Sequence, residues 1–495
     1  MSLSSKKHRQ FEVKTLREYV FRGTITQEDR RRADYKYVCF NVPEQADVIH
    51  VAYDYPKTPA KKNVVDIGVF DSEGSFRGWS GSNRTSFFVS NFTATPGYLL
   101  GKICPGMWKI ILGLYAISPD GCEYAVKIWV GGIRGTLQER EVVYSSGIEK
   151  PKKSGWFKGD LHAHTCHSDG VKSIDELVRE SEKMGLDFLA LTDHNTVSQS
   201  LDIAKPRLSD VLLIPGEEVT TYYGHANVWG NGEWVDFRRR TRKDFKKLID
   251  EVHAKGLLIS VNHPKSVDFF DGYWKFWDIV GFDCMEVWQG PWSSYNHRSL
   301  AWWDELLMKG ERVVAVGGSD FHGAERGLAN PTTWIYSDSL SVGDILDAIR
   351  RGHVFISRYV NGPEIHFCAD VNGDGEPDCM CGDEIPLSGK AELAFYMRAK
   401  GAEGLKLRLI SDGRVLEAQK VSGIDHISAY RARVEDDAYF RADIVKPPES
   451  ECNDTIETEV LALANPIYIR AGDRSARKTT RAAPLRQSHR GSLSS

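Results

Sequence analysis

Amphipathic and wholly apolar stretches alternate along the middle of the chain. Positions 174, 177, 178, 181 and 184 follow the i, i+3, i+4, i+7 period of a helix, and Ser173 and Glu176 form a capping-box pattern at its start. The apolar run 188–191 comes next and leads to Asp193 and His194. The pattern therefore predicts a helix followed by a buried strand with polar residues at its tip.

The same order recurs further along the chain. Apolar runs that lead to polar residues span 211–214, 257–261, 283–285 and 312–316. Helical stripes precede two of these runs and cover 245–252 and 300–307. Strands that alternate with helices predict a parallel sheet, and right-handed crossovers place the C-terminal ends of its strands on one rim. In a barrel, that rim is where active sites lie.

The polar residues of this region are of types that bind metal ions. Eight candidate ligands occur in six short motifs: His162, His164, Asp169, His194, Glu218, His263, Asp320 and His322. His225, in an expected loop or edge strand, and Glu286, at a strand end, are candidate further ligands or neighbours of the ligands. A single histidine is more often a surface or structural residue, but the joint pattern favours a metal centre.

The donor types narrow the chemistry of this centre. Imidazoles and carboxylates without a cysteine array favour Zn, Mn or Fe, with a position left open for water. Because one catalytic zinc ion uses about three protein ligands, the larger set indicates two or three divalent ions, with Glu218 expected to bridge them. Such a centre generates hydroxide from bound water near neutral pH, and it holds both the attacking and the leaving oxygen of a displacement reaction. Ester hydrolysis by a metal-activated water is the expected reaction.

The motifs resemble those of the polymerase and histidinol phosphatase (PHP) family over residues 155 to 360. The resemblance implies a distorted seven-stranded, TIM-like (β/α) barrel and, in most members, hydrolysis of phosphate esters. It also implies three ligand sets: His162, His164, Glu218 and Asp320; Glu218 and His263; and Asp169, His194 and His322. The expected catalytic residues are Asp169, His194, His263 and His322. His263 or His322 is the candidate general acid, if it is not bound to metal.

Segments rich in β-strand on both sides of the barrel resemble the branch that contains carbaryl hydrolase and similar esterases. The expected substrate is a phosphate mono- or diester, and a carbamate or carboxylic ester is the alternative, because fold and flanks do not determine a substrate. Lys265, Arg326 and Arg358 are candidates to pair with a substrate anion, with a solvated rim as the alternative for at least two. A non-catalytic, metal-stabilised glycan-binding protein is the second alternative, disfavoured because structural metal sites are usually closed by four ligands.

The segment ahead of the barrel is expected to form a β-sandwich over residues 11–145. Its β-branched and aromatic runs, separated by turn residues, are 35–40, 48–53, 64–70, 108–114 and 124–130. We expect it to be a packing partner for the barrel, with a sugar-binding or substrate-gating module as the alternative. A linker at 145–155 leads into the barrel domain, 155–360.

A second β-sandwich is expected over residues 361–472, with strands at 391–397, 405–410 and 438–444. The loop ahead of them presents oxygen ligands in the manner of a calcium site, at Asp370, Asn372, Asp374 and Asp378. Cys381 stands where an EF-hand has a bidentate glutamate, so a plain Asx-rich turn is an equal alternative. The basic tail 473–495 lacks hydrophobic period and is expected to be disordered.

Composition agrees with a multidomain globular enzyme. A chain of 495 residues suits about three domains. The net charge of -4 indicates no general attraction to nucleic acid, so a small-molecule ester is the expected partner. The N-terminal sequence lacks a signal-peptide core and no run reaches membrane-spanning length, which favours a cytoplasmic protein. Nine scattered cysteines do not suggest a disulfide scaffold. The native metal and the oligomeric state do not follow from the residues.

Overall fold

The computed structural model describes residues 12–57, 62–134, 153–230, 232–265, 274–323, 325, 327–447 and 458–471. The chain divides into two compact units. The first comprises residues 1–150, 161–279 and 320–328, and the second comprises residues 151–160, 280–319 and 329–495. All eight candidate metal ligands belong to the first unit. The tail 473–495 and most of the expected linker lie outside the described residues.

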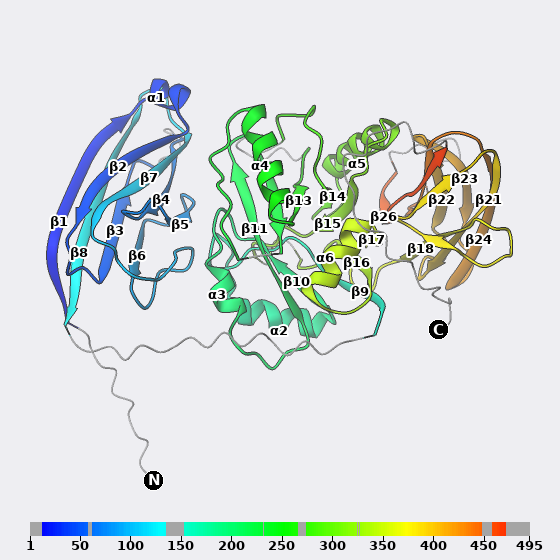
Figure 1. The fold of residues 1–495 in the computed structure, drawn as a ribbon, viewed down its shortest axis with the longest axis horizontal. Coiled ribbons are helices and arrows are strands. Elements are labelled where there is room, and N and C mark those ends of the chain that lie inside the picture. The colour runs from blue at the N-terminus through cyan, green and yellow to red at the C-terminus, as the bar shows by residue number, and fades with distance from the viewer. Residues whose placement is uncertain are drawn as a thin grey trace, which may run out of the picture. The chain divides into compact units, whose positions relative to one another are not determined.

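Residues 12–134 of the first unit form two four-stranded antiparallel sheets, drawn in blue to cyan in Figure 1. One sheet has the order β1 (Glu12–Ile25), β8 (Cys122–Arg134), β3 (Val48–Asp54) and β6 (Ser86–Ser90). The other has the order β2 (Tyr35–Val42), β7 (Gly106–Ala116), β4 (Val64–Phe70) and β5 (Phe76–Ser80). The short helix α1 (Gln27–Arg32) joins β1 to β2.

The two sheets share one hydrophobic core. Alternate residues of β2, namely Val38, Phe40 and Val42, are buried, as the period of a half-buried strand requires. They belong to the same cluster as Ile128 of β8 in the other sheet. Each run predicted as a strand in this segment is present. The sequence patterns missed β1, β5, β6 and α1.

The rest of the first unit mixes helices and strands. Its strands are β10 (Phe188–Leu191), β11 (Leu212–Thr221), β12 (Gly224–Trp229) and β13 (Leu258–Val261), and its helices are α2 (Ile174–Met184), α3 (Gln199–Ile203) and α4 (Arg242–Ala254). Helix α2 begins at the predicted capping box, in which Ser173 and Glu176 each bond the backbone of the other, and it ends at Gly185 in a left-handed conformation.

The expectation of a wholly parallel sheet was wrong in this unit. Strands β10 and β11 are parallel, but β11 pairs antiparallel with β12, and β12 pairs antiparallel with β13. Only Tyr222 and Tyr223 separate β11 from β12. A connection of two residues permits a hairpin and excludes a parallel crossover.

The second unit contains the remaining central elements. Its strands are β9 (Gly155–Asp160), β14 (Cys284–Gln289), β15 (Val314–Gly318), β16 (Thr332–Ser337) and β17 (Val354–Ser357), and its helices are α5 (Ser294–Met308) and α6 (Val342–Arg351). Strands β14 and β15 are parallel, whereas β16 pairs antiparallel with both β9 and β17. The fold is therefore multidomain and mainly β with few helices, and closure into a seven-stranded barrel stays a prediction.

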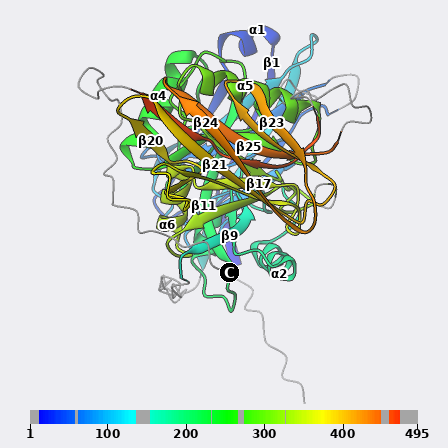
Figure 2. The same ribbon diagram turned by 90° about the vertical axis from the view of Figure 1, so that its right-hand side faces the viewer.

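The C-terminal part of the second unit faces the viewer in Figure 2. Its strands are β18 (Glu364–Asp370), β19 (Cys379–Met380), β20 (Glu384–Leu387), β21 (Ala391–Lys400), β22 (Lys406–Ser411), β23 (Arg414–Lys420), β24 (Asp425–Val434), β25 (Ala438–Val445), β26 (Val460–Ala464) and β27 (Ile467–Ala471). One sheet has the order β19-β18-β21-β24, and β26 pairs with β17. Because that pairing crosses residue 360, the predicted domain boundary there remains a prediction.

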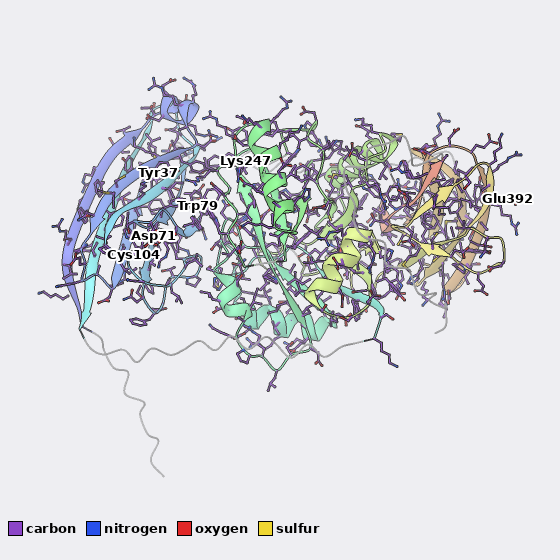
Figure 3. All side chains as sticks on the ribbon, in the orientation of Figure 1. Tyr37, Asp71, Trp79, Cys104, Lys247 and Glu392 are labelled. Carbon is purple, nitrogen blue, oxygen red and sulfur yellow. The ribbon has the colours of Figure 1, made fainter. Side chains whose placement is uncertain are left out.

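The two sheets of residues 12–134 pack against the α/β part of the first unit. Trp79, labelled in Figure 3, lies with its ring centroid 4.6 Å from that of Phe237. Tyr37, also labelled there, accepts a hydrogen bond of 3.0 Å from Arg238. Among the described residues, no helix is long and apolar enough to cross a bilayer.

Candidate metal centre

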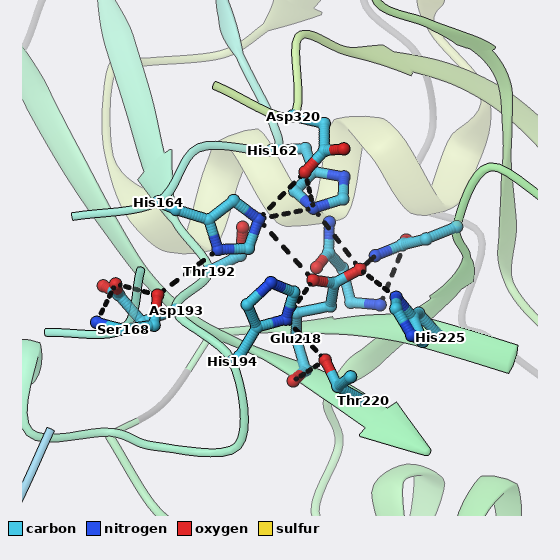
Figure 4. A network of polar contacts seen from close by, with 12 residues as sticks. His162, His164, Ser168, Thr192, Asp193, His194, Glu218, Thr220, His225 and Asp320 are labelled. Atoms are coloured by element: carbon cyan, nitrogen blue, oxygen red, sulfur yellow. Dashed lines mark hydrogen bonds and ion pairs between the residues drawn. The ribbon is translucent and has the colours of Figure 1, made fainter. Parts of the chain in front are cut away.

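The ends of successive strands bring the candidate ligands together. His162 and His164 follow β9, His194 follows β10, and His263 follows β13. Glu218 lies inside β11, because that strand continues beyond the predicted run 211–214 to Thr221. Figure 4 shows the side chains of His162, His164, His194 and His225 turned toward Glu218.

Glu218 lies at the middle of the cluster. It is fully buried, and imidazole nitrogens approach both of its carboxylate oxygens. The nitrogens near Oε1 are His263 Nε2 at 3.2 Å, His225 Nδ1 at 3.3 Å and His162 Nε2 at 3.5 Å. The nitrogens near Oε2 are His194 Nδ1 at 2.7 Å and His164 Nε2 at 3.5 Å. A carboxylate with imidazole nitrogens near both of its oxygens is placed to bridge two ions.

His162, His164 and Asp320 form a second close group. The two Nε2 atoms are 3.1 Å apart, and Asp320 Oδ1 lies 3.0 Å from that of His164 and 3.4 Å from that of His162. Two ring nitrogens and one carboxylate oxygen that face a common point suit a divalent cation with nitrogen and oxygen donors.

A third group lies toward solvent. His164, Asp169, His194 and His322 offer ligand atoms that all lie within 4.8 Å of one another. Asp169 Oδ1 lies 3.2 Å from His322 Nε2 and 3.6 Å from His194 Nε2. The side chains of Asp169 and His322 are 39% and 34% exposed, whereas that of Glu218 is 0% exposed. Water and substrate can therefore approach the cluster from the Asp169 side.

Charges inside the cluster support its ability to hold cations. Burial alone would raise the pKa of Glu218, but the imidazoles of His194 and His162 outweigh burial and hold that pKa well below its usual value. The pKa of Asp320 is lowered in the same way, because His162 and His322 outweigh burial. Burial, together with the neighbouring His322 and His194, lowers the pKa of His164 to about 4. The carboxylates stay charged, and His164 stays neutral, as metal ligands must be.

Some residues orient the ligands, and the sequence patterns did not assign them that role. Asp193 accepts hydrogen bonds from the backbone of Thr165 at 2.9 Å and of Ser168 at 3.0 Å, which shapes the loop before Asp169. Asn262 donates to Glu218 Oε1 at 2.9 Å. Asp193 directly precedes His194, and Asn262 directly precedes His263. Their place beside candidate ligands was the one signal in the sequence that could have indicated this role.

The backbone is strained at the cluster. Asp320 has φ of 51° and His263 has φ of 25°, in the left-handed region that side chains other than glycine rarely adopt. Strain of this kind persists where the surrounding structure holds a residue for function.

Comparison with known proteins agrees with the motifs. The family model of the PHP domain matches residues 160–264, which include His162, His194 and Glu218. The chain contains a PHP domain. The resemblance to the PHP family is thereby confirmed over residues 160–264, and the motif with Asp320 and His322 lies beyond the match.

The relatives match about a fifth of this chain. The "5'-3' exoribonuclease Rnm" of Salmonella typhimurium is 32% identical over 114 residues, which are 22% of this chain and 30% of that protein. The "5'-3' exoribonuclease" of Haemophilus influenzae is 42% identical over 110 residues, 22% and 31% of the two chains. The "DNA polymerase/3'-5' exonuclease PolX" of Bacillus subtilis is 36% identical over 106 residues, 21% and 16% of the two chains. The chain thus spans less than a third of the length of these relatives.

A solved structure is also similar, at low identity. It is a two-domain protein from Bacteroides vulgatus containing a "predicted PHP-like metal-dependent phosphoesterase", 16% identical, with a TM-score of 0.34. The match covers 66% of this chain and 100% of that one.

The remaining predicted residues of the PHP region differ in placement. His225 lies in β12, which is paired on both sides, so its assignment to a loop or edge strand was wrong. Glu286 lies in β14 of the second unit and is in none of the three ligand groups found among the described residues.

The candidate anion-binding cations have partners within the protein or lie outside the description. Lys265 Nζ lies 3.0 Å from the centroid of the Trp277 ring. Arg358 pairs with Glu459 at 2.5 Å. Arg326 lies outside the described residues. Lys265 and Arg358 therefore have contacts within the protein, and their role in binding a substrate anion stays a prediction.

The expected calcium loop lies in the second unit, after β18. Asp370 accepts hydrogen bonds from the backbone of Gly373 at 2.6 Å and Gly375 at 2.9 Å. Asp378 accepts from the backbone of Val371 at 2.8 Å and from the Asn372 side chain at 3.0 Å. These bonds are those of an Asx-rich turn. Calcium binding there, with Asp374, stays a prediction.

Proposed function

We propose that the protein is a metal-dependent phosphoesterase that hydrolyses phosphate diesters. The observation that carries the proposal is the set of three overlapping ligand groups, which lie beside one another in the first unit. A match to the PHP domain over residues 160–264, which contain six of the eight candidate ligands, supports it. The names of the relatives, exoribonuclease and exonuclease, favour phosphodiesters over monoesters as substrates.

The ligands proposed for the ions follow the three groups. His162, His164 and Asp320 would hold one ion, His263 and Glu218 a second, and Asp169, His194 and His322 a third, with Glu218 shared between the first two. When bound, such ions supply hydroxide near neutral pH and stabilise negative charge on phosphate oxygens. The donor set fits Zn, Mn or Fe.

The protein's own residues hold this arrangement and admit the substrate. The Thr220 hydroxyl lies 2.6 Å from His194 Nδ1, which orients that ring. Asn262 holds Glu218 by its amide. We propose that a phosphate group enters at the exposed side, where Asp169 and His322 lie, and that His263 or His322 protonates the leaving oxygen when it is not a ligand.

The other substrate classes have less support. None of the similar proteins named above is a carbamate or carboxylic esterase. A glycan-binding protein without catalysis does not account for a cluster that is open to solvent on one side. A nucleic-acid substrate would agree with the names of the relatives, although the net charge of -4 offers no general attraction to nucleic acid.

The test measures metal content and hydrolysis in the full chain. We expect two or three ions per chain by elemental analysis. We expect turnover of bis-p-nitrophenyl phosphate to exceed that of p-nitrophenyl phosphate, to be lost on chelation and to return with manganese, zinc or iron. Short 5'-labelled RNA strands test the nucleic-acid class, and 1-naphthyl carbamate tests the alternative ester.

Variants separate a catalytic site from a structural one. His162→Ala should reduce hydrolysis to the level of the chelated protein while leaving the far-UV circular dichroism unchanged. His50→Ala is the matched control, because His50 lies on β3 and stacks on Phe88 at 5.3 Å between centroids. Two or more bound ions without turnover of any phosphate ester would contradict the proposal.

A further inference from the structure

One arginine of the N-terminal sheets reaches the loop that carries Asp169. Arg84 lies between β5 and β6. Its Nη2 donates to the carbonyl oxygen of Cys166 at 3.0 Å and to that of Ser168 at 3.4 Å. All of these residues belong to the first unit. The contact therefore links a surface of the sandwich directly to the edge of the candidate metal centre.

The bond to Ser168 acts on Asp169 through the backbone. The Ser168 carbonyl belongs to the peptide plane that contains the Asp169 nitrogen, and such a plane is rigid. Holding this oxygen therefore limits how the Asp169 backbone, and hence its carboxylate, can rotate. Because the Asp169 side chain is 39% exposed, it has less packing around it than the buried ligands.

The loop is held at other points as well. Asp193 accepts from the backbone of Ser168, and the Val171 nitrogen donates to the His322 carbonyl at 2.9 Å. These bonds come from within the predicted PHP region, residues 155–360. Arg84 supplies a bond from residues outside that region.

A second contact fixes the sandwich beside the same loop. Thr196 donates to the Gly97 carbonyl at 2.9 Å, and the Gly97 nitrogen donates to Ser198 at 3.0 Å. A Cβ on Gly97 would lie 2.5 Å from the His167 carbonyl oxygen, which real side chains do not permit. This close approach holds residue 97 of the sandwich against the loop that carries Asp169.

We propose that Arg84 is a positioning residue that holds Asp169 in place for one of the metal ions, so that the N-terminal sandwich completes the metal centre. The inference rests on the proposed function for the ligand role of Asp169. It predicts that loss of the Arg84 contact weakens the binding of one ion, the one that Asp169 would hold with His194 and His322. The other ions should stay bound.

The experiment compares metal binding in full-length variants. Arg84→Met keeps the aliphatic part of the side chain and removes both bonds, Arg84→Lys keeps the charge but not the forked geometry, and Asp169→Asn defines the loss of the ion. Arg238→Met is the matched control, because Arg238 donates to Tyr37 of the sandwich at 3.0 Å. Ion number is measured by elemental analysis, and affinity is measured by titrating the metal-free protein with Zn or Mn against a competing chelator.

Asp169→Asn should lose one ion. We expect the affinity of Arg84→Met for that same ion to be at least tenfold weaker than that of the wild type, and we expect the other ions to stay bound. Arg84→Lys should recover part of this affinity, and Arg238→Met should match the wild type. The unfolding temperature of the metal-free Arg84→Met protein should stay close to that of the wild type, which a purely structural role would not predict.

The outcomes distinguish this inference from the proposed function. Wild-type affinity in Arg84→Met, alongside the loss in Asp169→Asn, overturns the positioning role alone. No loss in Asp169→Asn overturns the ligand assignment and this inference together. Absence of bound metal in the wild type overturns the proposed function itself. If Arg84→Met does not fold, wild-type affinity in Arg84→Lys overturns the positioning role.

Discussion

At the scale of single residues, the cluster's behaviour depends on which imidazoles carry protons. Burial lowers the pKa of His322, but Asp320 and Asp169 outweigh burial and raise it to about 8. Burial also opposes protonation of His194, and Asp169 and Glu218 raise its pKa to about 10. In the metal-free protein both rings are therefore protonated at neutral pH, and a metal ion must displace those protons.

This competition gives a pH dependence for metal binding. Below pH 8, protons compete with the metal ion for His194 and His322, so the affinity for the ion that these residues would hold with Asp169 should fall by about tenfold or more for each unit of pH. Isothermal titration of the metal-free protein at pH 6, 7 and 8 measures the slope and the protons released. In His322→Gln the slope should be shallower. An affinity that is constant over this range would contradict the expected protonation.

The sequence predicted the candidate ligands better than it predicted the contacts of individual charged side chains. The eight ligand candidates follow from motifs, and they lie close together in the structure. The partners of Lys265 and Arg358 did not follow, because Trp277 and Glu459 are selected by tertiary contact and carry no local pattern.

At the scale of elements, local signals predicted three of the six described helices, α2, α4 and α5. The capping box at Ser173, the stripe of α2 and its glycine stop all act within a few residues, so they can be read without knowing the fold. Hairpin β11–β12 was missed, because the run of residues between these strands carries no strong turn signal such as Asn-Gly.

The cap of α2 can be measured directly. Ser173→Ala removes the side-chain acceptor of the Glu176 nitrogen and should lower the free energy of unfolding by about 1 kcal/mol, as for other N-caps. Urea unfolding of the metal-free chain, followed by circular dichroism, measures the change. Ser294→Ala is the control, because Ser294 is the first residue of α5 and Ser293 is the cap. Equal stability of the two variants would show that the cap contributes little.

At the scale of the whole molecule, buried charges join elements far apart in the second unit. Arg441 of β25 donates to Asp304 of α5 at 2.8 and 2.7 Å, and Arg408 of β22 donates to Asp443 at 2.8 and 2.9 Å. Arg441 also pairs with Asp443 at 3.1 Å. All of these side chains are buried, so water cannot replace a missing partner.

Removing one member of this network should therefore be costly. Asp304→Ala leaves the Arg441 charge without its main partner, and we expect the free energy of unfolding to fall by about 3 to 5 kcal/mol. The double variant Asp304→Leu with Arg441→Met should recover much of that loss, because no buried charge is left unpaired between those two positions. Denaturant unfolding of both proteins makes the comparison. A double variant no more stable than Asp304→Ala would contradict this account.

The sequence alone predicted the PHP domain, the types of the candidate ligands and about half of the described helices and strands, because these depend on motif residues, hydrophobic period and caps within short windows. Tertiary structure decided the rest. It placed His225 beside Glu218 through an antiparallel strand, and Arg84 beside the Asp169 loop across 82 residues of chain. Strand pairing, register and the partner of each buried charge arise from contacts between distant segments, so no local pattern encodes them.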